Sequence, residues 1–257
     1  MIPIKDNIPT NRFPLVTVAL ILLNVVVYVL SIRHGGSLIS GPAVHETAKY
    51  GAIPYAITHP GAHCGVVGTP AGDALGCTRR AGVVSSIPPW ETVFSSMFMH
   101  GSILHIAGNM LFLWIFGNNV EDAMGGVKFL GFYLLGGIAA LALQVAVGPN
   151  SLAPTIGASG AIAAVLGGYI LLYPHARVLT FVFIILFFTV IELPAVVMLA
   201  IWFAEQALLG AANLTNSSGG GGVAYFAHVG GFVCGLLTIR LLAAGRKSPV
   251  ARRAAVY

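Results

Sequence analysis

The sequence predicts an all-α membrane protein, a bundle of six transmembrane helices with a long external loop after the first helix. Two observations lead to this prediction. The chain has 257 residues, of which 57% are hydrophobic and only 8% are charged, and its mean hydropathy is +0.88; a soluble domain has about 25% charged residues. The apolar residues also gather into segments that approach the roughly 20 residues a helix needs to cross a bilayer.

This composition excludes several classes of protein. Too few polar side chains are present to cover the surface of a soluble enzyme or to keep a disordered chain in solution. The net charge of +5 comes from 13 Lys and Arg against 8 Asp and Glu, an excess too small for a basic nucleic-acid-binding surface. We therefore expect a single domain that lies in a lipid bilayer and binds no nucleic acid.

Residues 15–32 are the first predicted span. A short segment, residues 1–14, precedes it and carries Lys5 and Arg12, as the start of a signal peptide would. The apolar run is longer than a signal-peptide core, however, and no small-residue cleavage site follows it. We therefore expect a retained helix behind a cytoplasmic N-terminal segment.

Residues 34–90 form the predicted external loop, because they are rich in Gly, Pro and His and too polar to cross a bilayer. Cys64 and Cys77 lie in this loop. A disulfide between them is possible in an oxidising compartment, but their spacing fits two free thiols equally well. Cys234 lies in an apolar segment, and we expect its side chain to pack between helices and to take no part in chemistry.

Further apolar segments complete the predicted membrane domain, residues 15–242. These spans are residues 92–116, 129–147, 155–173, 194–210 and 223–242. A basic tail follows at residues 243–257. Residues 178–193 are also apolar and could form a seventh span.

The distribution of basic residues decides between six and seven crossings. The segment before the first span and the tail after the last are both basic, so the positive-inside rule puts both ends in the cytoplasm and requires an even number of crossings. The loops at residues 148–154 and 211–222 carry no charge and fit the outside. We therefore interpret residues 178–193 as a shallow or re-entrant segment on the cytoplasmic side of the plasma (inner) membrane.

Polar side chains stand in the first halves of the second, fourth and sixth spans. They are His105 and Asn109, Ser159, and His228. With six crossings that start in the cytoplasm, these three spans all begin at the outer face, so their polar residues can meet a few turns below the outer surface. Polar groups inside a bilayer are costly and usually mark function.

Ser159 stands in the run Gly157-Ala158-Ser159-Gly160, at the start of the fourth span. The first N–H groups of a helix lack intrahelical partners and favour an anion, and glycine lets a substrate backbone approach closely. These features favour a serine nucleophile beside an oxyanion site that includes Gly157. The alternative is that Ser159 only caps the helix and that Gly157 and Gly160 only pack.

His105 and Asn109 are four residues apart and share one face of the second span. Such side chains donate hydrogen bonds to the developing oxyanion in acyl transfer, so both are candidate oxyanion helpers. The alternative is a polar clasp between helices. His100, in the same span, is more typical of a structural histidine.

His228 lies near the start of the sixth span, after a run of four glycines. Gly231 and Gly235 follow with the spacing of a close-packing helix face, which would bring the sixth span against the fourth and His228 within reach of Ser159. An imidazole there can take the serine proton and later protonate the leaving amine. The alternative is a structural histidine at a helix end.

The acidic residues exclude other protease chemistries. Asp6, Asp73 and Asp122 are the only Asp residues, and none lies inside a predicted span, so a paired-Asp intramembrane protease is excluded. The chain has no H-E-x-x-H motif and no Cys/His set with zinc spacing, and we expect no metal and no cofactor. A Ser/His dyad with an Asn-assisted oxyanion site remains.

In these motifs the chain resembles the rhomboid family of intramembrane serine proteases, over about residues 90–242. The matching motifs are His100-Gly101-Ser102 through His105, Gly108-Asn109-Met110, Val120-Glu121 with Gly125, Gly157-Ala158-Ser159-Gly160, and Ala227-His228 with Gly231 and Gly235. The resemblance implies a six-helix core and cleavage of membrane-embedded substrates. By position, it implies that Ser159 is the nucleophile and His228 the general base. His105 and Asn109 would be the oxyanion helpers.

The resemblance also implies how substrates reach the site. Transmembrane protein segments would come sideways from the bilayer and unwind locally, because a helical carbonyl is already hydrogen-bonded. We expect the fifth span, with Trp202 and Phe203, to form a movable wall beside the cavity. The chain departs from the family at Ala163, where some relatives carry an aromatic residue against which the base histidine stacks.

Two other functions are compatible with parts of this pattern. A catalytically silent family member would bind or escort membrane proteins, but Ser159 and His228 are the residues that such relatives usually lack. A small transporter or channel would have internal repeats and charged or unwound residues near the bilayer centre. The sequence shows no repeat, and its polar cluster is off-centre.

Overall fold

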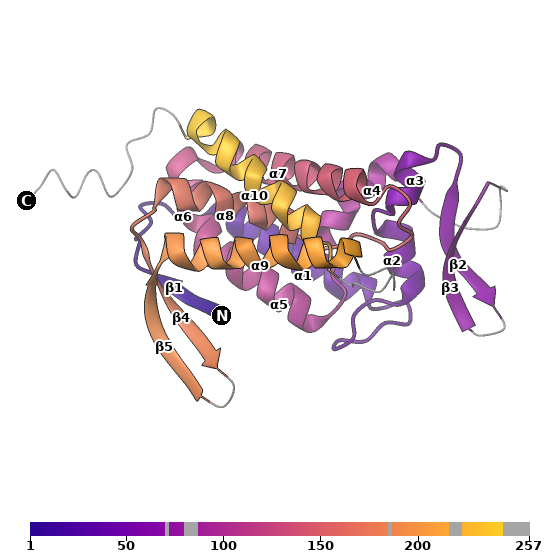
Figure 1. Ribbon diagram of the computed structural model, residues 1–257, viewed down its shortest axis with the longest axis horizontal. Helices are drawn as coiled ribbons and strands as arrows, with labels where there is room; N and C mark the ends of the chain where they lie inside the picture. The colour runs from indigo at the N-terminus through magenta and orange to yellow at the C-terminus, as the bar shows by residue number, and fades with distance from the viewer. Residues whose placement is uncertain (70–71, 80–86, 185–186, 216–222, 244–257) are drawn as a thin grey trace, which may run out of the picture.

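The computed structural model describes residues 1–69, 72–79, 87–184, 187–215 and 223–243. Its helices run side by side along the longest axis of the molecule (Figure 1). They are α1 (Leu15–Ser31), α7 (Gly126–Val147), α8 (Ser159–Leu172), α9 (Ala195–Thr215), α10 (Tyr225–Leu242) and one continuous stretch that consists of α5 (Ile103–Phe112), the π-helical turn η2 (Leu113–Gly117) and α6 (Asn118–Met124). Of the predicted basic tail, residues 244–257 lie outside the described residues.

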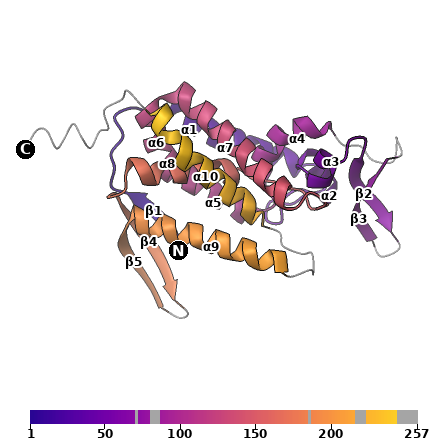
Figure 2. The same cartoon turned by 45° about the horizontal axis from the view of Figure 1, so that its top comes forward.

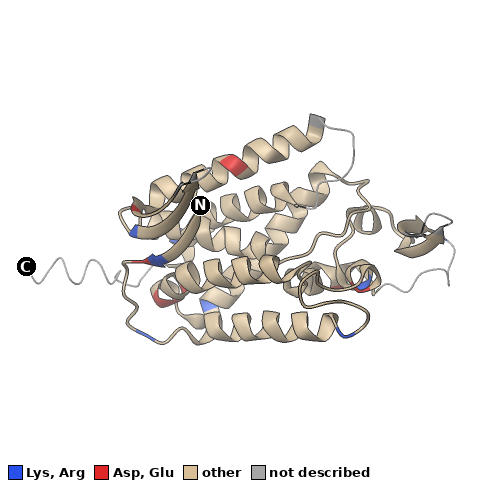
Figure 3. Cartoon of the chain, turned by 90° about the horizontal axis from the view of Figure 1, so that it is seen from below, with Lys and Arg blue, Asp and Glu red and all other residues tan. Residues whose placement is uncertain are grey.

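Four of the described helical stretches are long and apolar enough to cross a membrane. They are Ile103–Met124, Gly126–Val147, Ala195–Leu214 and Tyr225–Leu242. Two further helices, α1 and α8, are apolar but shorter, with 17 and 14 residues. Charged residues lie mainly toward the ends of the bundle, and the helices between the ends carry few of them (Figure 3). The protein is therefore a mostly helical integral membrane protein.

The boundaries predicted for the second span are wrong. The sequence predicts one helix over residues 92–116, whereas the structure breaks it between α4 (Pro89–Ser95), with the 3-10 turn η1 (Ser96–Phe98), and α5. Ser102 starts the new helix, because its hydroxyl accepts a hydrogen bond from the backbone N–H of His105 at 3.1 Å, as an N-cap residue does. A hydropathy value averaged over a whole span does not detect this break, because the residues on both sides of it are apolar.

The all-α prediction is also wrong, because the described chain contains two small sheets. One is antiparallel, with the strand order β1 (Ile2–Asp6), β4 (Arg177–Ile184) and β5 (Phe187–Pro194). Within residues 178–193, the described residues therefore form the paired strands β4 and β5 in place of a seventh helix. Their β-branched and aromatic side chains favour strands.

The predicted external loop, residues 34–90, contains the second sheet and short helices. The elements are α2 (Val44–Tyr50), α3 (Pro54–Thr58) and the hairpin of β2 (His63–Thr69) and β3 (Gly72–Thr78). Cys64 lies opposite Cys77 in this hairpin, and a disulfide joins them. Figure 1 shows the β2–β3 hairpin at the opposite end of the molecule from β1, β4 and β5. We call these two ends the hairpin end and the sheet end.

Contacts at the sheet end bring together segments that are distant in the sequence. Glu121 in α6 accepts hydrogen bonds from the backbone N–H groups of Val16 and Thr17, at 3.0 and 2.7 Å, and so caps the start of α1. Lys128 donates to the carbonyl of Leu242, the last residue of α10. The start of α1, the α6–α7 turn and the end of α10 therefore all lie at this end.

The central helix is α8, in which every residue from Gly160 to Tyr169 is buried. It packs against α7 and α10, and the three helices lie side by side in Figures 1 and 2. The strand-like bridge between Thr155 and Ala52 ties the segment before α8 to the hairpin end. The first residue of α8, Ser159, is therefore held near that end.

Candidate active site

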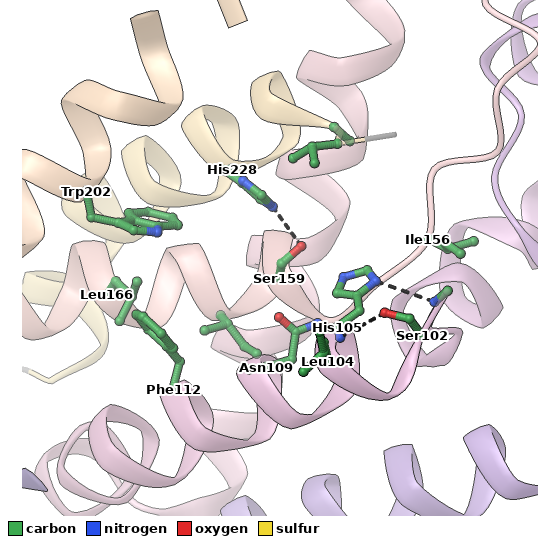
Figure 4. Close-up of a pocket in the computed structure, with 15 residues that line it drawn as sticks. Ser102, Leu104, His105, Asn109, Phe112, Ile156, Ser159, Leu166, Trp202 and His228 are labelled. Atoms are coloured by element: carbon green, nitrogen blue, oxygen red, sulfur yellow. Dashed lines mark hydrogen bonds between the residues drawn. The ribbon is translucent and has the colours of Figure 1, made fainter. Parts of the chain in front are cut away.

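A cavity of about 520 Å³ opens among α5, α8, α9 and α10 (Figure 4). Its wall is mainly apolar, with a few polar groups, as is typical of a binding site. The polar residues singled out in the sequence all line it: Ser159, His228, His105 and Asn109. Apolar lining residues include Leu104, Phe112, Leu166 and Trp202.

The hydroxyl oxygen of Ser159 lies 2.8 Å from Nε2 of His228, which is hydrogen-bond distance. Ser159 is the first residue of α8, and His228 lies in the first turn of α10. The two helices start at the same end of the bundle, so their first turns bring the side chains together. In Figure 4 the two side chains point toward each other, and a dashed line marks their hydrogen bond.

Glycines let α10 approach α8 closely enough for this contact. A Cβ built on Gly231 would overlap the carbonyl oxygen of Gly160, and one built on Gly235 would overlap the carbonyl oxygen of Ala164. Gly160 also faces α7, since its built Cβ would lie 2.6 Å from the Cβ of Ala140. Backbones in such contact are what small residues permit between membrane helices.

Gly157 keeps a space open between Ser159 and His105. Its φ of +124° lies in a region that residues with side chains rarely adopt. Its backbone N–H donates to the carbonyl of Ser96 at 2.9 Å, which fixes the loop. A Cβ built here would lie 2.8 Å from Nε2 of His105 and 3.4 Å from the Ser159 hydroxyl, so a larger residue would fill the space.

His105 has one ring nitrogen engaged and one directed toward this space. Its Nδ1 accepts a hydrogen bond from the backbone N–H of Gly101, at 3.4 Å. Because Nδ1 accepts, the proton of the neutral ring is on Nε2. Nε2 is the ring atom nearest to Gly157, so its N–H can donate to a group bound there.

Asn109 is bonded to His100, which the sequence suggested to be structural. The Asn109 amide donates to His100 Nε2 at 2.8 Å, and His100 Nδ1 donates to the carbonyl of Phe98 at 3.2 Å. His100 is 0% exposed, and its Nε2 also lies 3.5 Å from the N–H of Ala158. His100 thus links Asn109 of α5 to Ala158, the residue before α8. One N–H of Asn109 is occupied by this contact, and its amide has a second.

Two residues of α9 contact His228 in ways that the sequence does not predict. Gln206 Oε1 lies 2.7 Å from His228 Nδ1, and the centroid of the Trp202 ring lies 5.8 Å from that of the imidazole. Trp202 is predicted only as part of a wall, and Gln206 belongs to no motif. The sequence does carry a signal for Gln206. A polar side chain inside a span is costly and usually marks function, and Gln206 lies one helical turn from Trp202.

The arrangement suits acyl transfer. A hydroxyl stands beside a proton acceptor, and N–H donors stand on the other side of a glycine that leaves room for a substrate backbone. The part of the chain that the structure describes holds no group of three His, Cys, Asp or Glu side chains that could bind a metal ion.

Comparisons with known proteins agree on one family. The family model of the Rhomboid domain matches residues 88–245, more than half of the chain. Rhomboid protein 1, mitochondrial, of Saccharomyces cerevisiae is 37% identical over 101 residues, 36% of this chain and 28% of that protein. Presenilin-associated rhomboid-like protein A, mitochondrial, of Danio rerio is 33% identical over 84 residues, 32% of this chain and 22% of that protein.

A plant protein matches in the same way. Rhomboid-like protein 11, chloroplastic, of Arabidopsis thaliana is 34% identical over 77 residues, which make up 30% of this chain and 27% of that protein. All three matches therefore span less than a third of the relative's length. Such partial coverage supports the family and does not transfer the activity or substrates of a whole relative.

Proposed function

The chain belongs to the rhomboid family, and on that premise we propose that it is an intramembrane serine endopeptidase. It cleaves transmembrane segments of membrane proteins with a dyad of Ser159 and His228. The observation that carries the proposal is the 2.8 Å contact between the Ser159 hydroxyl and His228 Nε2, in a cavity that an extended backbone could enter.

His228 acts first as a base and then as an acid. Its Nε2 takes the proton of Ser159 as the serine oxygen attacks the substrate carbonyl, which gives a tetrahedral oxyanion. The imidazolium then gives its proton to the leaving amine, and the acyl-enzyme forms. A water molecule then attacks the acyl carbon while His228 Nε2 takes its proton, and the imidazolium returns a proton to the Ser159 oxygen as the acyl–oxygen bond breaks, which releases the acid product.

The oxyanion forms on the side of Ser159 that faces Gly157 and His105. The Nε2–H of His105 and the second N–H of Asn109 are the side-chain donors in reach of this space. Backbone N–H groups in the first turn of α8 add to them, because they lack intrahelical partners. Donors fixed before the reaction stabilise the oxyanion without reorganisation.

The substrate reaches the cavity from the bilayer, between α5 and α9. Leu104 and Phe112 on α5 and Trp202 on α9 line the cavity on these two sides. Transmembrane segments with small or helix-weakening residues near their outer end are the preferred substrates, because such segments unwind most easily.

The membrane domain, residues 15–242, crosses the bilayer six times. The four long apolar helices and the two shorter ones, α1 and α8, make up the six. The pairing of β1 with β4 and the contact of Lys128 with Leu242 support an even number, since they bring both ends of the domain to the sheet end. The sheet end, with residues 1–14 and the tail at 243–257, faces the cytoplasm.

The opposite end faces outward. It carries the loop at residues 34–90 with its disulfide, which fits an oxidising compartment. The plasma (inner) membrane is the proposed location. The mitochondrial and chloroplastic names of the relatives describe those proteins.

A cleavage assay in liposomes tests the proposal. The purified protein is reconstituted with a panel of single-pass membrane proteins, and the fragments are identified by mass. Ser159→Ala and His228→Ala are expected to abolish cleavage. The matched controls Ser151→Ala and His175→Ala, which lie outside the cavity lining, are expected to retain it. Cleavage by Ser159→Ala would refute the proposed nucleophile.

A further inference from the structure

Given the proposed function, we propose that Gln206 is the positioning residue of His228: its amide oxygen fixes both the orientation and the tautomer of the imidazole. The carbonyl-type oxygen Oε1 lies 2.7 Å from Nδ1 of His228. Gln206 is only 8% exposed, so water does not compete freely for this hydrogen bond. The contact joins α9 to α10 across 22 residues of sequence.

The tautomer of His228 follows from which neighbouring atoms can donate a hydrogen bond and which can only accept one. An amide oxygen can only accept, so Nδ1 of His228 must carry the ring proton of the neutral imidazole. Nε2 then has a free lone pair, and it lies 2.8 Å from the Ser159 hydroxyl. Both ring nitrogens are therefore engaged, one as donor to Gln206 and one as acceptor from Ser159. This is the protonation state that a general base requires.

The rest of α9 supports this geometry. Trp202 stands one turn before Gln206, on the same helix face, and its ring centroid lies 5.8 Å from that of His228. Next to it, Phe203 stacks on Phe232 of α10, with centroids 4.6 Å apart. These rings hold α9 against α10 at the level of the imidazole. The position of Ala163 offers no ring to His228, so α9 supplies the contacts that hold the base.

A neutral amide suits this location. In the Ser-His-Asp triad a carboxylate holds the histidine in the right tautomer and orientation. A carboxylate inside a bilayer is costly to bury, whereas an amide fixes the same tautomer through its dipole. Gln206 thus completes a chain of three groups, Ser159, His228 and Gln206, that needs no buried charge.

The test is Gln206→Met, which keeps the length of the side chain and removes the acceptor. We expect kcat for the cleaved substrate to fall at least about 10²-fold, the low end of what a positioned general base contributes, with KM unchanged. The matched control is Gln144→Met on α7. Gln144 accepts a hydrogen bond from the backbone N–H of Ala227, the residue before His228, and does not touch the imidazole. An equal loss of kcat in both variants would overturn the proposal.

A second readout distinguishes this proposal from the proposed function. In protein labelled with ¹⁵N-histidine and reconstituted in lipid, the His228 signals are those absent from His228→Ala. We expect the wild type to carry the proton on Nδ1 and Gln206→Met to shift the population toward Nε2. This measurement needs no cleavage, so it tests the positioning role of Gln206 even if the wild type proves inactive. A wild type with the proton on Nε2, or an unchanged tautomer in Gln206→Met, would overturn the positioning role.

Discussion

Gly157 lies directly against the imidazole of His105, so that a Cβ on the glycine would come within 2.8 Å of Nε2. The same backbone position has a φ of +124°. Two independent constraints, space and conformation, therefore require glycine between the proposed nucleophile and the proposed oxyanion donor. This relationship gives the first prediction.

Gly157→Ala should lower the cleavage rate by more than the accompanying loss of folded protein accounts for. The methyl group displaces His105 from the oxyanion space, and the strained φ costs about 1–3 kcal/mol. Gly148→Ala is the control, because its φ is −127° and its built Cβ meets only ordinary contacts at 3.7 and 3.8 Å. Cleavage rates and unfolding midpoints are measured together. Full activity in Gly157→Ala would show that this space is not part of the site.

The cap on α1 gives a prediction about stability alone. Glu121 is buried and accepts from the backbone N–H groups of Val16 and Thr17 and from the Thr17 hydroxyl. Glu121→Gln replaces one acceptor oxygen by a donor, so we expect a loss of about 1–3 kcal/mol. The measurement is the unfolding midpoint in detergent.

The neighbouring acid provides the control for Glu121. Asp122 accepts hydrogen bonds from Asn11 at 3.0 and 3.1 Å in an exposed position. Asp122→Asn should change stability by no more than about 0.5 kcal/mol, as exposed substitutions usually do. Equal effects of the two substitutions would contradict the capping role of Glu121.

Asp6 gives a prediction about pH. Burial raises the pKa of this carboxyl above its ordinary value of 3.8, while the hydrogen bond from the Tyr169 hydroxyl acts in the opposite direction. A carboxyl whose pKa is raised on folding holds its proton more tightly in the folded chain. Its contribution to stability is therefore full below pH 3.8 and is lost as the pH rises through the folded-state pKa.

Asp6→Asn should remove this dependence. The unfolding midpoint of the wild type, relative to that of Asp6→Asn, is expected to fall as the pH rises from about 4 toward neutral. Asp122→Asn controls for the loss of one negative charge at the same end of the bundle. A relative midpoint that rises over this interval would contradict the raised pKa of Asp6.

The cysteines give a prediction about the hairpin end. Cys64 and Cys77 are bonded to each other and Cys234 is free. Alkylation of the denatured wild type should therefore modify one thiol before reduction and all three cysteines of the chain after it. Cys64→Ser should expose a second thiol, Cys77, before reduction. Three reactive thiols in the unreduced wild type would contradict the disulfide.

Much of the site's layout follows from the sequence because topology links distant residues. Once the basic ends require an even number of crossings, the spans that carry Ser159 and His228 must start at the same face. Their polar side chains then lie at one depth, whatever the details of packing. Gly231 and Gly235 further indicate which helices touch, since small residues at this spacing permit close approach.

Other features depend on contacts that a linear pattern does not contain. The hydrogen bond between Gln206 and His228 joins two helices, and neither residue's neighbours indicate the partner. The break before Ser102 escapes hydropathy because only a few residues interrupt two apolar stretches. Strand β4 pairs with β5 and also with β1, which lies far away in the sequence, so tertiary structure sets this pairing.

The most direct test of Ser159 as the nucleophile is the site of reaction with a fluorophosphonate probe. The wild type in lipid is labelled, digested and mapped by mass spectrometry. We expect an adduct on the Ser159 oxygen that is absent from Ser159→Ala and lost or strongly reduced in His228→Ala. An adduct on a different serine, or labelling that persists in Ser159→Ala, would contradict it.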